Sequence, residues 1–249
     1  MSNICRNWNV LCWNVRGLNS ETRQRAVRQK IEGSQCSIAC LQETKCASFD
    51  YISIKSFCPK RFGSFVCSPS IGASGGIIVV WNSSVFSGTV IEVQQFAVVV
   101  QFTSRQNNET WTLVAVYGPC QGQARDTFVN WLYNLVIPIN EHWLLLGDFN
   151  FLRSVDNRNL PGGDINDMFI FSEIIGHLGL LELPIKGRSY TWSNMQDTPL
   201  LEQLDWFFTS VHWISDYPMT EVLPLARTAS DHVPCLVSIK SSIPKSNLF

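Results

Sequence analysis

The chain has 249 residues, of which 45% are hydrophobic and 16% charged, which predicts one globular domain over residues 1–249 with its core at about 7–240. The formal charge of −1 excludes a generally basic surface, so any attraction to a polyanion must be local or carried by a divalent metal. No apolar run reaches the roughly 18 residues of a membrane span, and the first residues lack a secretory pattern, so we expect an intracellular protein, nuclear or cytoplasmic, neither secreted nor membrane-bound.

Nine cysteines occur in the chain, an odd number that contains no Cys-x-x-Cys pair. A disulfide framework needs pairs, and zinc sites usually show closely spaced pairs, so this pattern favours neither. Several of the cysteines lie inside apolar runs. We therefore predict reduced thiols that are mostly buried.

The first part of the chain predicts strands that end in polar side chains. Residues 8–15 form a β-rich run that places Asn14 at its C-terminal end, and a serine-capped helix over residues 20–32 follows. The next apolar run, residues 36–41, leads directly into Glu43. The same pattern of an apolar strand with a polar end therefore occurs twice within 45 residues.

Three further β-branched runs follow at residues 77–81, 96–102 and 111–117, and they predict a meander of antiparallel strands. The third run ends at Tyr117, before a Gly-Pro pair. Residues 124–136 then place apolar side chains at helical spacing, which predicts a helix that faces the core.

The stretch 142–150 is the most informative part of the sequence. Four apolar residues precede Gly147, which indicates a buried strand with Asp148 and Asn150 at its C-terminal edge, where α/β sheets usually place their sites. A carboxylate and an amide at this spacing could act on a water or metal and on a substrate oxygen. The alternative is an Asp-Phe-Asn turn that only ends the strand.

The rest of the chain alternates between loops, one helix and short strands. Residues 153–167 have loop composition, and residues 168–178 resume helical periodicity. Strands are predicted at 189–193, 204–209, 219–223 and 233–239. The strand-rich halves with few helices predict an α/β fold in which two sheets pack face to face with helices outside.

Eight polar side chains share a position at or beside the end of a predicted strand: Asn14, Glu43, Tyr117, Asp148, Asn150, Asp205, Asp231 and His232. Each has an ordinary structural explanation, as a turn former, a solvated helix start, a core ring with its hydroxyl at the rim or a hydrogen-bonded core histidine. As a set, oxygen ligands and one histidine at one end of a sheet are typical of a hard-metal phosphoryl-transfer site.

Six motifs in order carry a resemblance to a known family: WNVRG (13–17), LQETK (41–45), YGP (117–119), GDFN (147–150), LDWFFTS (204–210) and SDH (230–232). The chain resembles the endonuclease/exonuclease/phosphatase superfamily and, more narrowly, the apurinic-type endonuclease domain of plant LINE-type non-LTR retrotransposons. The resemblance implies a four-layer α/β sandwich with mixed or antiparallel sheets, a Mg²⁺ or Mn²⁺ ion, and hydrolysis of a phosphodiester bond, with DNA as the partner.

The resemblance also implies a role for each matched residue at the metal. Glu43 matches the principal metal carboxylate of the family, and Asn14 lies beside it in the metal and phosphate site. Asp231 matches a second acidic residue at the metal. The roles of base and metal ligand remain exchangeable on the sequence alone.

The remaining five residues match the catalytic positions of the family. Asp148 matches the aspartate that orients or deprotonates the attacking water, and Asn150 the amide that holds a phosphate oxygen. Tyr117 matches the tyrosine near the scissile phosphate. His232 matches the histidine that contacts the phosphate, and Asp205 the carboxylate that orients that imidazole. An Asp–His pair can keep the imidazole protonated and aimed at a dianionic transition state.

The sequence departs from the family in one place, because Glu202 and Gln203 stand where many members have Ser-Arg. Any DNA contact made by that arginine is absent. Proteins of this LINE type continue into a reverse transcriptase, so we expect an excised domain or a freestanding remnant. Two alternatives remain: the same fold acting on an RNA tail, a phosphoinositide or a sphingolipid, and a catalytically silent domain that binds nucleic acid or protein.

Overall fold

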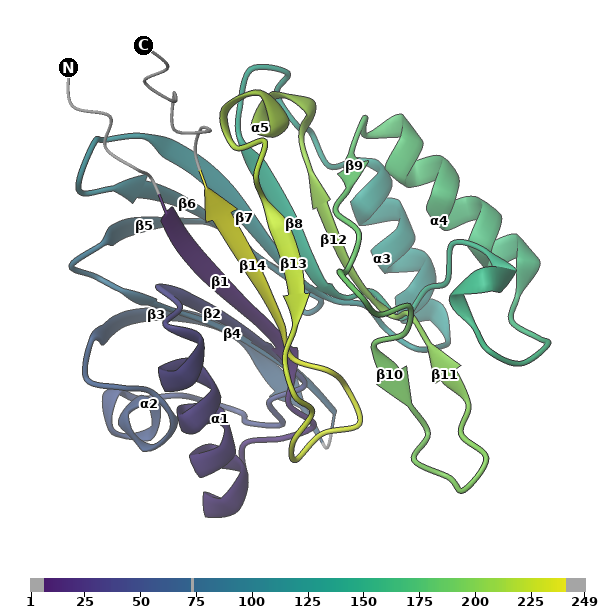
Figure 1. The fold of residues 1–249 in the computed structure, drawn as a ribbon, viewed down its shortest axis with the longest axis horizontal. Coiled ribbons are helices and arrows are strands. Elements are labelled where there is room, and N and C mark those ends of the chain that lie inside the picture. The colour runs from purple at the N-terminus through teal and green to yellow at the C-terminus, as the bar shows by residue number, and fades with distance from the viewer. Residues whose placement is uncertain (1–6, 73, 241–249) are drawn as a thin grey trace, which may run out of the picture.

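Two six-stranded mixed sheets form the centre of the computed structural model, which describes residues 7–72 and 74–240 (Figure 1). The first sheet has the order β13-β14-β1-β2-β4-β3, with strands β1 (Asn7–Asn14), β2 (Ile38–Gln42), β3 (Phe62–Ile71), β4 (Ser74–Asn82), β13 (Glu221–Pro224) and β14 (Cys235–Lys240). The second has the order β5-β6-β7-β8-β12-β9, with strands β5 (Phe86–Val93), β6 (Ala97–Ser104), β7 (Thr110–Tyr117), β8 (Trp143–Asp148), β9 (Leu181–Glu182) and β12 (Asp205–Thr209). A separate hairpin joins β10 (Trp192–Ser193) to β11 (Leu201–Glu202).

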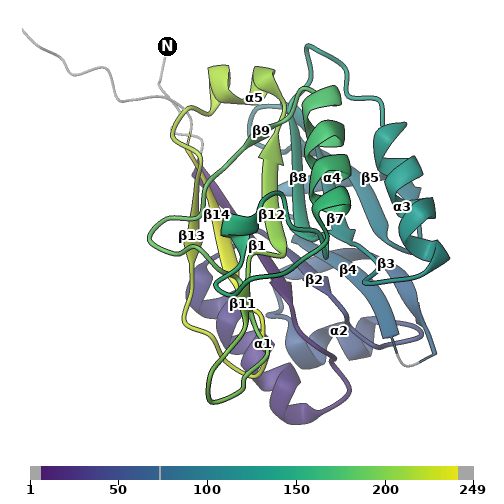
Figure 2. The same cartoon turned by 90° about the vertical axis from the view of Figure 1, so that its right-hand side faces the viewer.

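The longer helices cover the outer faces of the two sheets, as Figures 1 and 2 show from two sides. They are α1 (Glu21–Ser34), α2 (Tyr51–Phe57), α3 (Gln123–Tyr133) and α4 (Ile165–His177), and a short α5 (Val211–Asp216) lies at the upper end in both views. Side chains of α1 and α2 pack on the first sheet, and those of α3 and α4 on the second. None of the helices in the described part of the chain is long and apolar enough to cross a membrane.

Alternating burial along the strands explains the four layers. Val10 and Cys12 of β1 point between the two sheets, whereas Leu11 and Trp13 of the same strand pack against the helices α1 and α2. A strand that is buried on both faces needs apolar residues at successive positions. The predicted α/β fold, with two sheets face to face and helices outside, is therefore confirmed.

A parallel pair lies within each sheet, β1 beside β2 and β7 beside β8, and the other strand pairs in the two sheets are antiparallel. The close approach of β7 and β8 depends on Gly147, whose φ is 142°. A Cβ atom at this position would lie 2.0 Å from the carbonyl oxygen of Val116. Glycine is therefore required in the GDFN motif for the backbone to pass.

The predicted antiparallel meander of residues 77–81, 96–102 and 111–117 is wrong in its first strand. The first of these runs forms β4, which pairs with β2 and β3 in the other sheet, while the meander consists of β5, β6 and β7. Because β4 is buried on both faces, its apolar run carries no information about which sheet it joins. Other elements were not predicted: α2, α5, β3, β5 and the two-residue strands β9 and β11.

Several boundaries also differ from the predictions. Helix α4 begins at Ile165, where the side chain of Asp164 accepts hydrogen bonds from two backbone N–H groups, so the predicted loop is shorter than expected. The predicted strand at 189–193 is reduced to the two residues of β10.

The prediction of reduced, mostly buried thiols is confirmed for the described residues. Eight cysteines are free and five of them are buried, while Cys5 lies outside the described ranges.

Candidate active site

Strand pairing brings most of the predicted polar side chains to one edge of the two sheets. Tyr117 at the end of β7 pairs with Asp148 at the end of β8, and Asp148 pairs in turn with Asp205 at the start of β12. In the first sheet, Asn14 ends β1 beside the last residue of β2, and Glu43 follows β2. This edge lies at the lower end of Figure 1, near the β10–β11 hairpin.

Asp148 makes the link between the two sheets. Its carboxylate is 1% exposed, and its Oδ2 accepts a hydrogen bond of 2.8 Å from the side-chain amide of Asn14. Its Oδ1 accepts one of 3.0 Å from the backbone N–H of Asn150. The imidazole Nε2 of His232 lies 3.6 Å from Oδ2. Burial raises the pKa of Asp148 to about 7, although the positive charge of His232 opposes this shift.

His232 and Asp205 form a buried pair beside Asp148. The Nδ1 atom of His232 lies 2.8 Å from Oδ2 of Asp205, and both side chains are 3% exposed. Burial alone would lower the pKa of His232, but the carboxylates of Asp205 and Asp148 reverse this effect and raise it to about 9. The imidazole therefore carries a proton at neutral pH, with its Nε2 edge directed towards Asp148.

Glu43 and Asp231 lie on the side of the first sheet and are bridged by Arg16. The Arg16 guanidinium is 3.5 Å from a carboxylate oxygen of Glu43 and 3.4 Å from one of Asp231. Lys45 lies 3.1 Å from the other oxygen of Glu43. The Arg16 side chain is 45% exposed, so the guanidinium can move away when another cation takes its place.

The hydroxyl of Tyr117 is influenced by the carboxylates of both sheets, Glu43 from the first and Asp148 from the second. Burial raises the pKa of its hydroxyl well above the usual range, and the negative charges of Glu43 and Asp148 add to this effect. The phenol is therefore protonated at any physiological pH. It can donate a hydrogen bond to an anionic oxygen placed between the two carboxylates.

Asn150 is fixed in a left-handed backbone conformation with a φ of 55°. Its side-chain amide donates a hydrogen bond of 2.7 Å to the carbonyl oxygen of Gly118, and Arg125 donates one of 3.0 Å to the Asn150 carbonyl oxygen. One of the two amide hydrogens is used in this way, which leaves the second for a ligand. Gly118 must be glycine, because a Cβ atom there would lie 2.1 Å from the carbonyl oxygen of Phe149.

Strained backbone is concentrated at this edge. Arg16, Glu43, Lys45 and Asn150 all have positive φ values between 53° and 55°. A left-handed conformation costs about 1–2 kcal/mol in a residue other than glycine, so it persists where the surrounding structure enforces it. The strain supports a functional interpretation of these strand ends rather than one as ordinary turns.

The sequence pattern missed the residues that position the acidic side chains. The hydroxyl of Thr191 accepts hydrogen bonds from the backbone N–H groups of Leu204 and Asp205, each at 3.1 Å. The indole N–H of Trp192 donates to Asp231 at 2.9 Å, and Ser230 donates to the carbonyl oxygen of Asn14 at 2.7 Å. A two-residue strand such as β10 has no periodicity, so the usable signal was the SDH motif, of which Ser230 is the first residue.

Glu202 and Gln203, which stand in place of Ser-Arg, contact the loop that contains Asn157 and Arg158. Glu202 lies 3.4 Å from the guanidinium of Arg158, and the Gln203 side chain accepts a hydrogen bond of 3.1 Å from Asn157. These contacts attach the segment after Asn150 to the β10–β11 hairpin. The departure therefore coincides with a structural role in this chain.

The donor set suits a hard divalent cation. Glu43, Asp231 and Asn14 supply carboxylate and amide oxygens beside Asp148, and these are the ligands that Mg²⁺ and Mn²⁺ prefer. The raised pKa of Asp148 indicates that its buried negative charge is incompletely balanced by the protein. A divalent cation would provide this balance, so the residues fit a metal.

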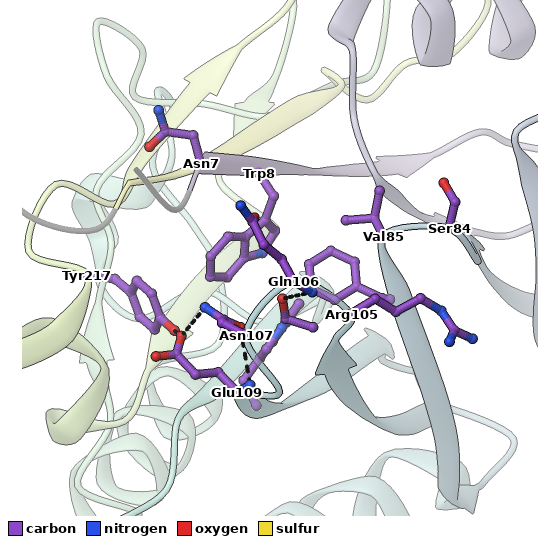
Figure 3. A pocket seen from close by; sticks show the side chains of 12 residues that line it. Asn7, Trp8, Ser84, Val85, Arg105, Gln106, Asn107, Glu109 and Tyr217 are labelled. Atoms are coloured by element: carbon purple, nitrogen blue, oxygen red, sulfur yellow. Dashed lines mark hydrogen bonds between the residues drawn. The ribbon is translucent and has the colours of Figure 1, made fainter. Parts of the chain in front are cut away.

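A cavity of about 260 Å³ at the other end of the sheets is separate from this site (Figure 3). It is lined by Trp8 at the start of β1, by Glu109 and by Tyr217, whose hydroxyl donates to Glu109 at 3.2 Å. Trp8 and Asn14 lie at opposite ends of the same strand. The cavity therefore takes no part in the acidic site.

Known proteins share both the sequence pattern and the fold. Residues 11–232 match the model of the Endonuclease/Exonuclease/phosphatase family. The chain is 27% identical over 151 residues, 57% of its length, to the transposon TX1 uncharacterized 149 kDa protein of Xenopus laevis, of which it covers 11%.

Solved structures give the same result for the fold. The AP endonuclease LMAP of Leishmania major superposes with a TM-score of 0.75 at 18% identity, over 95% of this chain and 89% of that one. The endonuclease domain of TRAS1, a telomere-specific non-LTR retrotransposon, gives 0.68 at 17% identity, over 93% and 98% of the two chains. The order of motifs, the two-sheet fold and the family match together show that the chain belongs to the endonuclease/exonuclease/phosphatase family.

Proposed function

We propose that this protein is a phosphodiester hydrolase that depends on Mg²⁺ or Mn²⁺ and nicks DNA. It would be the endonuclease domain of a LINE-type retroelement like those of plants. The observation that carries the proposal is the contact of the buried Asp205–His232 pair with Asp148, next to Asn14 and the carboxylate of Glu43. This set combines a base, a protonated imidazole and oxygen ligands for a metal within one edge of the fold.

Asp148 acts as the base in this mechanism. A pKa near 7 suits a group that must take a proton from water at neutral pH. Water attacks phosphorus, a P–O bond forms, and the proton of the water passes to the Asp148 carboxylate while the bond to the leaving oxygen breaks. The hydrogen bonds from Asn14 and from the Asn150 backbone hold the carboxylate in position.

Three donors surround the place where negative charge develops. His232 presents a protonated imidazole held by Asp205, Tyr117 presents a protonated hydroxyl, and Asn150 presents its second amide hydrogen. Donors that are fixed before the reaction stabilise the transition state because they need little reorganisation. A bound metal supplies further positive charge to the phosphate oxygens, and Glu43, Asp231 and Asn14 would hold it.

DNA is the proposed substrate on the basis of local charge and of the relatives. Arg16, Arg23 and Lys45 gather beside the site, where Arg23 donates to the carbonyl oxygen of Arg16. This provides a local positive region on a protein of net charge −1. A cavity of about 420 Å³ beside Tyr117, lined in part by Phe96, gives room for a nucleotide next to the scissile phosphate.

The link to a retroelement rests on two relatives, one a transposon protein and one a retrotransposon endonuclease domain. The matched segment is a small part of the transposon protein. We propose that the parent polyprotein of this chain carries a reverse transcriptase domain, which would extend a DNA end that the nick exposes.

A nicking assay on supercoiled plasmid tests the function. We expect conversion to open circles with Mg²⁺, none with a chelator, and no hydrolysis of phosphoinositide, sphingomyelin or poly(A) substrates in parallel reactions. Asp148→Asn should lower the nicking rate by about 10²–10⁴-fold, and Asp126→Asn, which alters an exposed carboxylate on α3, should leave it unchanged.

Each alternative has its own outcome in the same experiment. Hydrolysis of poly(A) or a lipid in preference to plasmid would assign the fold to another phosphoester. Binding of DNA without cleavage under any divalent metal would identify a silent binding domain. Cleavage that Asp148→Asn does not affect would remove the described site from the reaction.

A further inference from the structure

We propose that His142, His212 and Asp216 form a second metal site, selective for Zn²⁺ and separate from the active site. One ligand atom from each of the three side chains lies within 4.8 Å of the other two. The Nε2 atom of His142 is 2.9 Å from Oδ2 of Asp216, and the rings of His142 and His212 are 4.7 Å apart. Two imidazoles and one carboxylate are a ligand set that zinc prefers over magnesium.

The distances fit a tetrahedral ion with small adjustments. Zinc binds imidazole nitrogen at about 2.0–2.1 Å and carboxylate oxygen at about 2.0–2.2 Å, which places neighbouring ligand atoms about 3.3 Å apart. The ligand atoms of His142 and Asp216 are 2.9 Å apart, which is shorter than this, and the other ligand atoms in the cluster lie within 4.8 Å of one another. Rotations about the side-chain bonds of two surface residues would close the gap.

Secondary structure sets two of the ligands on one face. His212 and Asp216 are four residues apart in α5, and residues at this spacing project from the same side of a helix. His142 comes from a distant part of the sequence, directly before β8. The site would therefore join a helix to the start of a central strand.

Ser210 fixes the distance between these two segments. Its hydroxyl donates to the carbonyl oxygen of Glu141 at 2.7 Å and accepts from the backbone N–H of Trp143 at 3.1 Å, so it contacts both neighbours of His142. Its own N–H donates to the Trp143 carbonyl at 3.0 Å. The backbone that carries the ligands is thus held in place before any metal binds, which lowers the cost of binding.

Buried aromatic rings support the cluster from below. The ring of Tyr217 lies 5.3 Å from that of His142, and Trp213 lies 6.3 Å away. Both rings are almost completely buried. The ligands remain partly open, with His142 16% and Asp216 47% exposed, so an ion and its water can reach them.

The site lies at the opposite end of the fold from Asp148. Figure 1 shows α5 at the upper end and the β10–β11 hairpin at the lower end, and Figure 2 shows the same arrangement. Asp148 ends the strand that His142 precedes. Zinc here would stabilise the fold by connecting α5 to β8, and it would take no part in hydrolysis. Zinc would replace the contact between His142 and Asp216 with a bond from each of them to the ion.

The test measures zinc affinity by competition with a chromophoric chelator, in excess Mg²⁺. We expect one zinc equivalent in the wild type, and a loss of affinity greater than about 100-fold in His212→Ala, because outer-shell changes alone cost about 10–100-fold. Asp216→Asn, which keeps the shape of the side chain, should weaken binding as well. His177→Ala removes another exposed-surface histidine, stacked on Tyr133, and should leave zinc affinity unchanged.

Two further measurements separate this site from the active site. Asp148, Asp205 and His232 also form a compact cluster that zinc could enter, so His232→Ala is titrated in parallel and should keep the zinc equivalent. Zinc should raise the melting temperature of the wild type and of His177→Ala, but not that of His212→Ala. Plasmid nicking should be the same in His212→Ala and wild type. Equal zinc affinity in wild type, His212→Ala and Asp216→Asn, or loss of binding in His232→Ala alone, overturns the proposal.

Discussion

Glu43, which follows a strand of the first sheet, has the cationic groups of Arg16 and Lys45 within 3.5 Å of its carboxylate. Asp148, in the second sheet, pairs instead with a buried histidine among the described residues. The Nε2 atom of His232 lies 3.6 Å from its carboxylate oxygen Oδ2. The carboxylate of Glu43 lies beside partly exposed cations, so a metal ion can take their place. The carboxylate of Asp148 is buried, and burial raises its pKa. In the proposed mechanism, the first sheet therefore holds the metal and the second moves the proton.

The largest effect is expected for Asp148→Asn, which removes the base and preserves the size of the side chain. The rate of nicking should fall by about 10²–10⁴-fold, the contribution of a positioned general base. Binding of Mg²⁺ should survive, because Glu43 and Asp231 remain. Single-turnover kinetics with a separate metal titration check this, with Asp126→Asn as the control. A mutant with normal chemistry and weak metal binding would reverse the division between the two sheets.

The next effect concerns the coupling of Asp205 and His232. Removing one transition-state donor costs about 10²–10³-fold, so His232→Ala should lower kcat by this factor. Asp205→Asn should lose most of the same benefit, and the double mutant should be little worse than His232→Ala, because residues that act as a unit are not additive. A double-mutant cycle on the nicking rate measures this. Effects that multiply independently would mean that Asp205 only begins a strand.

The pH dependence sharpens the assignment of His232. Its pKa is raised to about 9, so the protonated donor is present below this pH and is lost as the pH rises through it. The wild-type rate should therefore fall above about pH 9, and the residual rate of His232→Ala should not. The same alkaline limb in both proteins would assign the titration to another group.

A smaller effect is expected for Glu43→Gln, which removes one anionic ligand from the first sheet. The Mg²⁺ concentration for half-maximal nicking should rise by about 10–100-fold, and saturating metal should restore most of the rate. Glu173→Gln alters an exposed carboxylate on α4 and serves as the matched control. An unchanged metal requirement would remove Glu43 from the site.

The smallest effect is expected for Arg16→Gln. Loss of the guanidinium that bridges Glu43 and Asp231 should raise Mg²⁺ affinity by a few-fold, since partly exposed ion pairs contribute about 0–1 kcal/mol. DNA affinity should fall at the same time, with a weaker dependence on salt, if the freed guanidinium contacts a phosphate. Metal and DNA titrations on one preparation test both. A fall in metal affinity would show that Arg16 positions the carboxylates rather than competing for them.

Much of the fold could be predicted from apolar periodicity, and the failures have physical causes. Strands such as β8, with a continuous apolar run, were predicted correctly. The exposed outward face of β5 and the half-buried residues of β3, which both lie at sheet edges, gave no clear alternation. Helix α2 has only seven residues, too few for a clear apolar period, and its signal in the sequence is the capping box of Asp50 and Ser53.

The candidate site was predictable where its residues end strands and unpredictable where they position others. Asp148, Asp205 and Tyr117 are brought together by register, which apolar runs anticipate. Thr191 reaches Asp205 through a tertiary contact of a loop, and no local pattern encodes such a contact. The roles of the eight residues in catalysis and metal binding stay predictions until the variants above are measured.

The position of β14 in the sheet has a consequence for the order in which the protein becomes active during synthesis. This strand lies between β13 and β1, and it pairs with β1 from Asn7 to Cys12, so β1 cannot complete its pairing until a strand from much later in the domain has been made. His232 lies just before β14, far along the chain from Asn14. A nascent domain therefore keeps the edge of β1 open until β14 has been translated, and it lacks the imidazole until shortly before that point. The proposed nuclease is thereby silent until β14 of this domain has been translated, and until then the unpaired edge of β1 is open to pairing with another chain.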